Sequence, residues 1–207
     1  WIDIEYKIYY QMLNAGIKMP ASTGSDWYIC SANRVYSECG PTFEYSSWLD
    51  SFKSGKTFIT NGPALFFTVD DVGPGGIIQA APGRNVEARV SWKSHYRVQS
   101  LEIVRNGTVI HSDKFPDGVT NGDIRFDFDL TTDGWLAARL FSDVRDSYLQ
   151  PQFAHTSPIY IETGQKSPEL IESSSKIYRE IEKSLEWIGN KGRFYTDKQR
   201  LEIQELY

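Results

Sequence analysis

The sequence predicts a mixed α+β protein, because the two ends of the chain carry the period of a helix and the middle carries the period of a strand. Residues 3–15 and 170–188 repeat apolar side chains every three or four positions. The middle of the chain instead holds short alternating runs separated by turn residues. We therefore expect three units. They are a first unit over residues 1–62 that begins with a helix, an immunoglobulin-like β-sandwich over 63–164, and a helical tail over 165–207.

Composition disfavours some classes of partner. The chain has 207 residues, of which 40% are hydrophobic, enough for a packed core. It carries 22 basic and 27 acidic residues and has a sequence pI near 5.3, a balance that disfavours binding to nucleic acid. No apolar run approaches the length of a membrane span. Cys30 and Cys39 could form one disulfide or remain free thiols.

The strands of the middle unit are marked by alternation and by turn residues. Asn106-Gly107, between residues 100–105 and 108–111, is a strong signal for a two-residue hairpin. Further strands are expected over residues 65–69, 86–92, 124–130, 134–141 and 158–162.

The first unit begins with a helix over residues 3–15, whose apolar positions include Ile4, Ile8 and Met12. An apolar segment over 17–21 follows and is expected to be a strand. It leads to Asp26, and this order of helix, strand and polar loop is that of an α/β barrel, where sites gather at the carboxyl ends of strands. Asp26 is therefore a candidate ligand or catalytic acid; the alternative is a polar turn in which Asp26 caps the next element.

The remaining helices have recognisable ends. A short helix over residues 46–54 should end at Gly55. Residues 56–63 should follow as a strand that runs into the turn Asn61-Gly62-Pro63, which marks the expected domain junction. Pro168 begins the first tail helix, and a capping box at residues 196–199 begins the second. Both tail helices are expected to pack against another part of the molecule. Because the chain starts at Trp1, we also expect an upstream part of the same protein.

Five spaced motifs together point to a family. They are Gly24-Ser25-Asp26, Asn33-Arg34-Val35-Tyr36, residues 48–63, residues 135–139 and residues 154–160. In this order they resemble the carboxyl-terminal portion of the CehA/McbA family of metallohydrolases, in the PHP (polymerase and histidinol phosphatase) superfamily. The resemblance implies that residues 1–62 are the last part, or remnant, of a PHP-type metal-binding α/β barrel that precedes the sandwich.

The resemblance also implies roles for particular residues. Asp26 matches the aspartate that is a metal ligand in the superfamily, and its hard oxygen suits zinc, manganese or iron. Ser25 could orient that carboxylate. The superfamily commonly has histidine where this chain has Tyr28, and its paired His-x-His is absent from the sequence.

Other candidates have two readings each. Arg34 is either a catalytic clamp for a substrate oxygen or part of a structural ion pair. Trp27, Tyr28 and Tyr36 either line a substrate pocket or pack over the barrel mouth. His155 either ligates metal or, as we expect, supports the site from behind by hydrogen bonds that hold the sandwich against the barrel.

The other polar clusters have simpler explanations. His95 at an expected turn and His111 at the end of a hairpin strand are expected to be solvated. Asp70-Asp71 and the pair Asp127 and Asp129 lack the spacing of a calcium loop.

The implied activity is divalent-metal-dependent hydrolysis of an ester, carbamate or phosphoester bond in a small-molecule substrate. We expect this segment to be inactive without the upstream barrel. The alternative is a non-catalytic β-sandwich module that binds a partner or serves as a scaffold.

Overall fold

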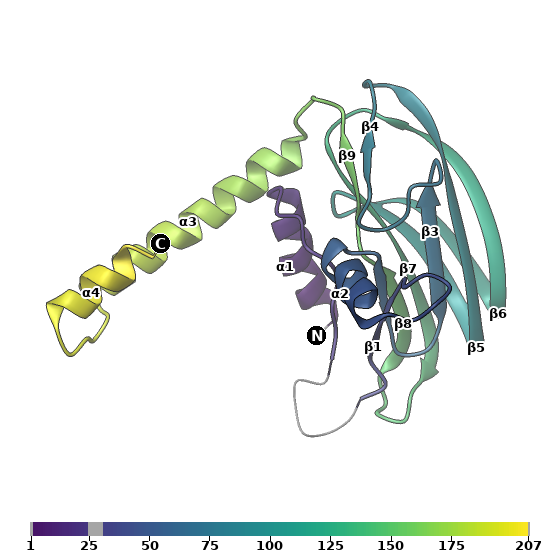
Figure 1. Ribbon diagram of the computed structural model, residues 1–207, viewed down its shortest axis with the longest axis horizontal. Coiled ribbons are helices and arrows are strands. Elements are labelled where there is room, and N and C mark those ends of the chain that lie inside the picture. The colour runs from purple at the N-terminus through teal and green to yellow at the C-terminus, as the bar shows by residue number, and fades with distance from the viewer. Residues whose placement is uncertain (1, 25–30, 207) are drawn as a thin grey trace.

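The computed structural model describes residues 2–24 and 31–206 and confirms a mixed α+β chain (Figure 1). The described part has one nine-stranded sheet and four helices. Its elements are α1 (Ile2–Asn14), β1 (Arg34–Ser37), α2 (Tyr45–Ser54), β2 (Thr57–Thr60), β3 (Ala64–Val69), β4 (Ile77–Gln79), β5 (Arg84–Arg105), β6 (Thr108–Leu130), β7 (Gly134–Arg145), β8 (Pro151–Thr156), β9 (Ile159–Glu162), α3 (Pro168–Asn190) and α4 (Asp197–Gln204).

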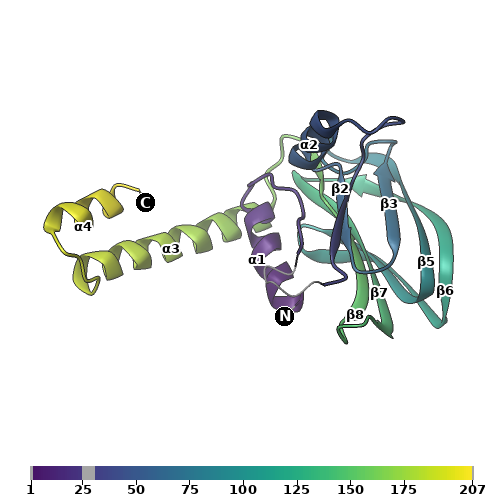
Figure 2. The same ribbon diagram turned by 60° about the horizontal axis from the view of Figure 1, so that its bottom comes forward.

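The sheet doubles over on itself through one long hairpin. Its strands follow the order β1-β2-β8-β7-β5-β3, with β6 paired to β5 and β9 paired to both β7 and β4. Residues 88–93 of β5 pair with β3, whereas residues 100–105 pair with β7. β6 accompanies β5 through both halves, along one side of the molecule (Figures 1 and 2). The β5–β6 hairpin therefore belongs to both layers.

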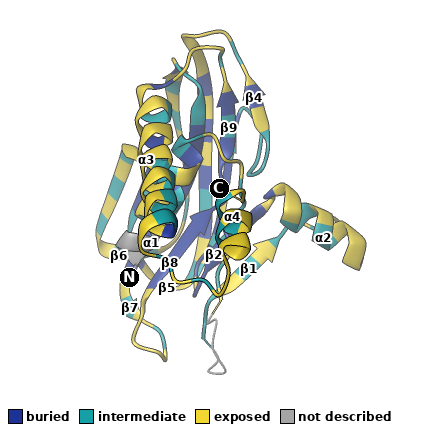
Figure 3. Cartoon of the chain, turned by 90° about the vertical axis from the view of Figure 1, so that its left-hand side faces the viewer, coloured by how far each residue is buried: buried dark blue, intermediate teal, exposed yellow. Residues whose placement is uncertain are grey.

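The main core lies between these two layers. Alternate residues of β3, such as Leu65 and Phe67, are buried against alternate residues of β5 and β7, such as Val90 and Leu140. This inward and outward alternation follows from the two-residue period of a strand. Figure 3 shows the buried residues concentrated in the sheet.

The predicted Asn106-Gly107 hairpin is confirmed, and it is longer than the sequence indicated. Both residues have positive φ angles, 50° and 86°, as a two-residue turn of this kind requires. The expected strands over 86–92 and 100–105 are a single strand, β5, and the expected strands over 108–111 and 124–130 are a single strand, β6. Register shifts between Lys93 and Ser100 accompany the passage from one layer to the other.

Glycine permits one close approach in the middle of this hairpin. Gly122 on β6 lies opposite Trp92 on β5. A Cβ atom at Gly122 would come within 2.2 Å of the indole ring. The turn-like residues of β6 thus accommodate a large core side chain instead of ending the strand.

Three strands were not predicted, and one predicted strand is absent. β1, β4 and β8 are new, and β8 carries His155. Residues 17–21 are irregular rather than a strand, which corrects the expectation for that segment. Because β2 pairs with both β1 and β8, residues on both sides of the expected junction at 62 contribute to one sheet.

The four helices of the described chain match the expected ones in position. The ends also follow the sequence signals: Gly55 adopts φ 78° at the end of α2, and the Thr196 side chain accepts a hydrogen bond from the Gln199 amide at the start of α4. The buried face of α1 differs from the expected one. Ile8 and Met12 are exposed, whereas Tyr10 and Leu13 are buried against β7.

α1 is fixed to the sheet by polar as well as apolar contacts. The Trp135 indole nitrogen donates to Asn14 Oδ1 at 2.7 Å, and Asn14 Nδ2 donates to the Asn106 carbonyl oxygen at 3.1 Å. The end of α1 is thereby attached to the start of β7 and to the β5–β6 turn.

α3 and α4 form an arm that extends away from the sheet (Figures 1 and 2). The beginning of α3 lies beside α1, and α4 folds back along the end of α3, where Ile188 is buried. Most of α3 is exposed (Figure 3), so the expected packing of this helix is limited, within the described chain, mainly to its two ends. None of the helices in this part of the chain combines the length and apolar character that a membrane crossing requires.

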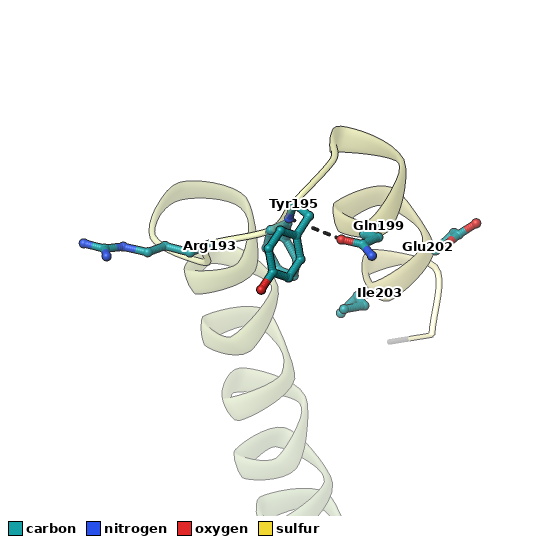
Figure 4. A pocket seen from close by; sticks show the side chains of 6 residues that line it. Arg193, Tyr195, Gln199, Glu202 and Ile203 are labelled. Atoms are coloured by element: carbon teal, nitrogen blue, oxygen red, sulfur yellow. Dashed lines mark hydrogen bonds between the residues drawn. The ribbon is translucent and has the colours of Figure 1, made fainter.

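An open pocket of about 320 Å³ lies at the far end of the arm (Figure 4). It is lined by Arg193, Phe194, Tyr195, Gln199, Glu202 and Ile203. Of the described residues expected to carry chemistry, Arg34, Tyr36 and His155 are not part of its lining.

Candidate functional site

The residues expected to form the metal and substrate site are only partly within the described chain. Ser25, Asp26, Trp27 and Tyr28 lie outside the described residues, as does Cys30. Arg34, Tyr36 and His155 lie within them.

Arg34 and Tyr36 do not share a face of the sheet with His155. Both are exposed residues of β1, and Val35 between them pairs with Ile59 of β2, which in turn pairs with His155. Because successive side chains alternate between faces, Arg34 and Tyr36 occupy the opposite face. The Tyr36 ring stacks on Phe58 with centroids 5.0 Å apart.

His155 is fully buried and joins the sheet to α1. Its Nε2 lies 2.6 Å from the Tyr10 hydroxyl, and its Nδ1 lies 2.6 Å from the Thr156 carbonyl oxygen. A carbonyl oxygen can only accept, so Nδ1 carries the proton, and the Tyr10 hydroxyl donates to Nε2. His155 is therefore a neutral imidazole with both nitrogens engaged, which agrees with a supporting role between sheet and helix.

Burial is the main cause of the unusual proton affinities here. It lowers the pKa of His155 from its ordinary value of 6.5 to about 4, with the positive charge of Arg139 acting in the same direction and the bond to Thr156 opposing it. Burial also raises the pKa of Tyr10 to about 12, although Arg139 opposes this shift. Both groups are consequently neutral across the physiological range.

A charged pair extends this network across the sheet. Glu102, Arg139 and His155 lie side by side on β5, β7 and β8. The Arg139 guanidinium binds Glu102 Oε2 at 2.7 Å and donates to the Tyr10 hydroxyl at 3.4 Å. It also lies over the Tyr6 ring, 5.8 Å from its centroid. These contacts give Arg139 a structural role between the sheet and α1.

Sequence reasoning did not identify Tyr10 or Glu102 as members of this cluster. The signal for α1 was available in its tyrosines at positions 6, 9 and 10, which recur at helical spacing. Glu102 faces α1 because it occupies the same face of the sheet as Arg139. That pairing depends on strand register, which the sequence does not display.

The irregular segment 17–21 lies close to the network. The Tyr9 hydroxyl donates to the Met19 carbonyl oxygen at 3.1 Å, and the Ala21 amide donates to Ser157 Oγ at 2.8 Å. Burial also raises the pKa of Tyr9, so its hydroxyl keeps its proton. The chain is thus held in place on its way to Asp26.

A divalent metal does not fit the described residues by themselves. Residues 2–24 and 31–206 contain no group of three or more His, Cys, Asp or Glu side chains placed to hold a metal ion. His155 would have to lose a hydrogen bond to become a ligand. A metal centre would depend on Asp26 and on ligands from outside this part of the chain.

The remaining histidines and acidic pairs have local partners. His95 is exposed but lies within β5 rather than at a turn. The His111 side chain is only 28% exposed, lies 2.8 Å from Asp113 Oδ2 and stacks on the Phe126 ring. The expectation that it is simply solvated was therefore wrong.

The acidic pairs considered for calcium lie where strands and turns explain them. Asp70 binds Arg84 and accepts from the Glu87 amide. Asp129 accepts a hydrogen bond from Asn85 on the outer face of the sheet.

Comparison with known proteins gives little beyond this geometry. No protein-family model and no curated protein matches the sequence. Among solved structures, the chain is similar to superoxide reductase (neelaredoxin) from Ignicoccus hospitalis, with 14% identity over 50% of this chain and 82% of that chain and a TM-score of 0.30. It is also similar to the PmoD soluble domain from Methylocystis sp. ATCC 49242 (Rockwell), with 9% identity over 48% and 90% of the two chains and a TM-score of 0.28. At such TM-scores neither likeness bears on function.

Proposed function

We propose that this chain is the carboxyl-terminal part of a divalent-metal-dependent hydrolase of the CehA/McbA type, acting on an ester, carbamate or phosphoester bond of a small molecule. In this proposal the residues that lead to Asp26 adjoin a PHP-type barrel, and β1 and β2 join the strands from β3 onward in its immunoglobulin-like sandwich. Asp26 is the metal ligand that this segment contributes.

One observation carries the proposal. Motifs that are far apart in the sequence converge on residues 19–21, directly before Gly24-Ser25-Asp26. Thr57 comes from the motif at 48–63, and Ser157 and Tyr160 come from the motif at 154–160; all three contact residues 19–21 through their hydroxyl groups. Such convergence is expected if the motifs serve one site.

The proposal predicts that activity and metal retention depend on Asp26 and on residues outside this segment. The 207-residue chain is expected to show no turnover of p-nitrophenyl acetate or p-nitrophenyl phosphate with zinc or manganese. In the full-length polypeptide, Asp26→Asn should reduce metal-dependent turnover by about 100-fold or more, since loss of even an outer partner of a metal site costs 10- to 100-fold. Metal content measured by mass spectrometry should fall with it.

Asp50→Asn provides the control, because Asp50 is an exposed carboxylate on α2. It should leave turnover and metal content unchanged. Equal activity of wild-type protein and Asp26→Asn would disprove the assignment of Asp26.

The second candidate is a non-catalytic binding or scaffold module. It is favoured by the apolar side chains exposed on α3, where Ile171 and Tyr178 are each 62% exposed and Trp187 is 56% exposed. Full-length protein that lacks both metal and hydrolytic activity would support this candidate over the hydrolase.

A further inference from the structure

The long hairpin leaves one edge of the sheet without a partner. Within the described chain β6 pairs only with β5, so the backbone along its other side is not paired to a strand. In Figures 1 and 2 β6 is the outermost strand, and no described element lies beyond it. An edge of this kind can accept a further strand through main-chain hydrogen bonds.

The two halves of β6 differ in how well they resist such pairing. The first half contains Lys114 and Pro116, and lysine and proline are residues that protect an edge strand. Residues 122–130, in the second half, contain neither. The free edge of residues 122–130 is therefore the part of β6 that is suited to pairing.

The apolar side chains of residues 122–130 are incompletely covered. Ile124, Phe126 and Phe128 alternate along the inner face and pack against the main core, yet they are only partly buried. They lie at the margin of the core because β6 is the last strand on its side of β5. A strand with the same alternation, added to β6, would extend the core over them.

The outer face of the same segment carries charges that β5 does not balance. Arg125 lies directly opposite Arg89, and Asp127 lies directly opposite Glu87. Like charges placed directly opposite each other destabilise a sheet.

Diagonal contacts relieve all but one of these charges. Arg89 binds Asp123, and Arg125 Nη1 lies 3.6 Å from Glu87 Oε1. Asp127 makes no hydrogen bond or ion pair with any described residue. The segment therefore lacks one cation, and the missing cation belongs opposite Asp127.

We propose that residues 122–130 are a dimer interface, in which β6 pairs antiparallel with β6 of a second copy of this chain. When Phe126 lies opposite Phe126 of the partner subunit, each Arg125 faces Asp127 of the partner subunit. The second copy thus supplies the missing cation twice, as the two-fold symmetry of a homodimer requires.

Charge and pattern together select this register. A shift of one residue would place apolar side chains on the charged face. Shifts of two residues would bring either Asp127 or Arg125 opposite the same residue of the partner subunit. In the chosen register Asp123 faces Asp129 of the partner subunit, but Asp123 is bound by Arg89 and Asp129 accepts a hydrogen bond from Asn85.

Charge reversal in the full-length polypeptide tests the interface. One short pair of strands makes a small interface, so sedimentation under reducing conditions should give a dissociation constant of about 1 μM to 1 mM. Arg125→Asp and Asp127→Arg should each raise it at least about 10-fold, since each sets like charges opposite each other at two symmetric positions.

Two combinations should restore the dimer. The double variant R125D/D127R exchanges the charges and keeps opposite charges facing each other. An equimolar mixture of the two single variants should form heterodimers, because each variant presents the charges that the other lacks. Neither register shifted by two residues predicts both losses and both recoveries.

Folding is not at risk in the single variants. Within one copy, Arg125→Asp places a carboxylate opposite Arg89, and Asp127→Arg places a guanidinium opposite Glu87, so each replaces a like pair by an opposite pair. Urea unfolding should therefore show no loss of stability in either monomer.

Lys176→Asp provides the control. It makes the same change of charge as Arg125→Asp and also breaks an ion pair, between Lys176 and Glu172 on the exposed face of α3. It should leave the dissociation constant unchanged.

The remaining outcomes would overturn the inference. They are a polypeptide that stays monomeric at about 1 mM, a dimer that neither single variant weakens, an equal loss in Lys176→Asp, and losses that neither the double variant nor the mixture reverses.

Discussion

Acidification from pH 6.5 to pH 4 is expected to remove about 3 kcal/mol of the free energy of unfolding through His155 alone. The pKa of His155 is about 4 in the folded chain, against 6.5 for an ordinary imidazole, and each pKa unit corresponds to about 1.4 kcal/mol. Between these two values the unfolded chain binds a proton that the folded chain excludes, so stability falls as the pH falls. Well below pH 4 both states are protonated, and this group adds nothing further.

The groups around His155 explain why protonation is resisted. Tyr6, Tyr9 and Tyr10 of α1 face it with aromatic rings, and Arg139 of β7 adds a positive charge. A protonated Nε2 could no longer accept from the Tyr10 hydroxyl. Acid should therefore weaken the attachment of α1 to the sheet first.

Two measurements check this result. Urea unfolding gives the free energies of unfolding of wild-type protein and His155→Gln at several pH values. The difference between these two free energies should narrow as the pH falls from 6.5 to 4. His95→Gln is the control, since His95 is exposed. An NMR titration that shows the His155 imidazole already protonated at pH 6 would contradict the prediction without requiring any variant.

Gly75→Ala is expected to lower the free energy of unfolding by roughly 2–4 kcal/mol. Gly75 has φ 78°, which disfavours alanine, and its backbone amide donates to the Pro158 carbonyl oxygen at 2.8 Å. An added Cβ would lie only 2.0 Å from the Ser54 carbonyl oxygen and 2.8 Å from the Gly55 carbonyl carbon. These are backbone atoms at the end of α2, so the cost of overpacking adds to the conformational cost.

Gly83→Ala separates the two costs. Gly83 has a similar φ of 85°, but nothing lies within 4 Å of a Cβ atom there. The free energy of unfolding of Gly83→Ala should fall only by the conformational cost of a positive φ angle, about 1 kcal/mol. Equal losses for the two variants in urea unfolding would show that the close contact between Gly75 and the end of α2 is unimportant.

Features with local causes could be predicted from the sequence. Asn106-Gly107 specifies its turn through the φ angles of two adjacent residues, and Gly55 ends α2 in the same way. β8 escaped prediction because residues 152–156 are buried on both faces, so the strand shows no alternation of polar and apolar residues.

The buried face of α1 was misjudged for a related reason. Hydropathy favoured Ile8 and Met12, yet the structure buries Tyr10, whose hydroxyl is satisfied by a histidine 145 positions away. Such a long-range partner leaves no trace in the spacing of residues. The candidate site shares this property, because Thr57 and Ser157 meet at Ala21 only after the sheet has formed.

The β5–β6 hairpin also has a consequence for biosynthesis. Because both strands take part in both layers, neither layer can be completed until residue 130 has been synthesised. α1 has to wait longer still, since its packing surface is made by β7 and by His155. During translation α1 therefore leaves the ribosome well before its partners, and folding of this part of the protein should proceed on the slow timescale of proteins dominated by distant contacts.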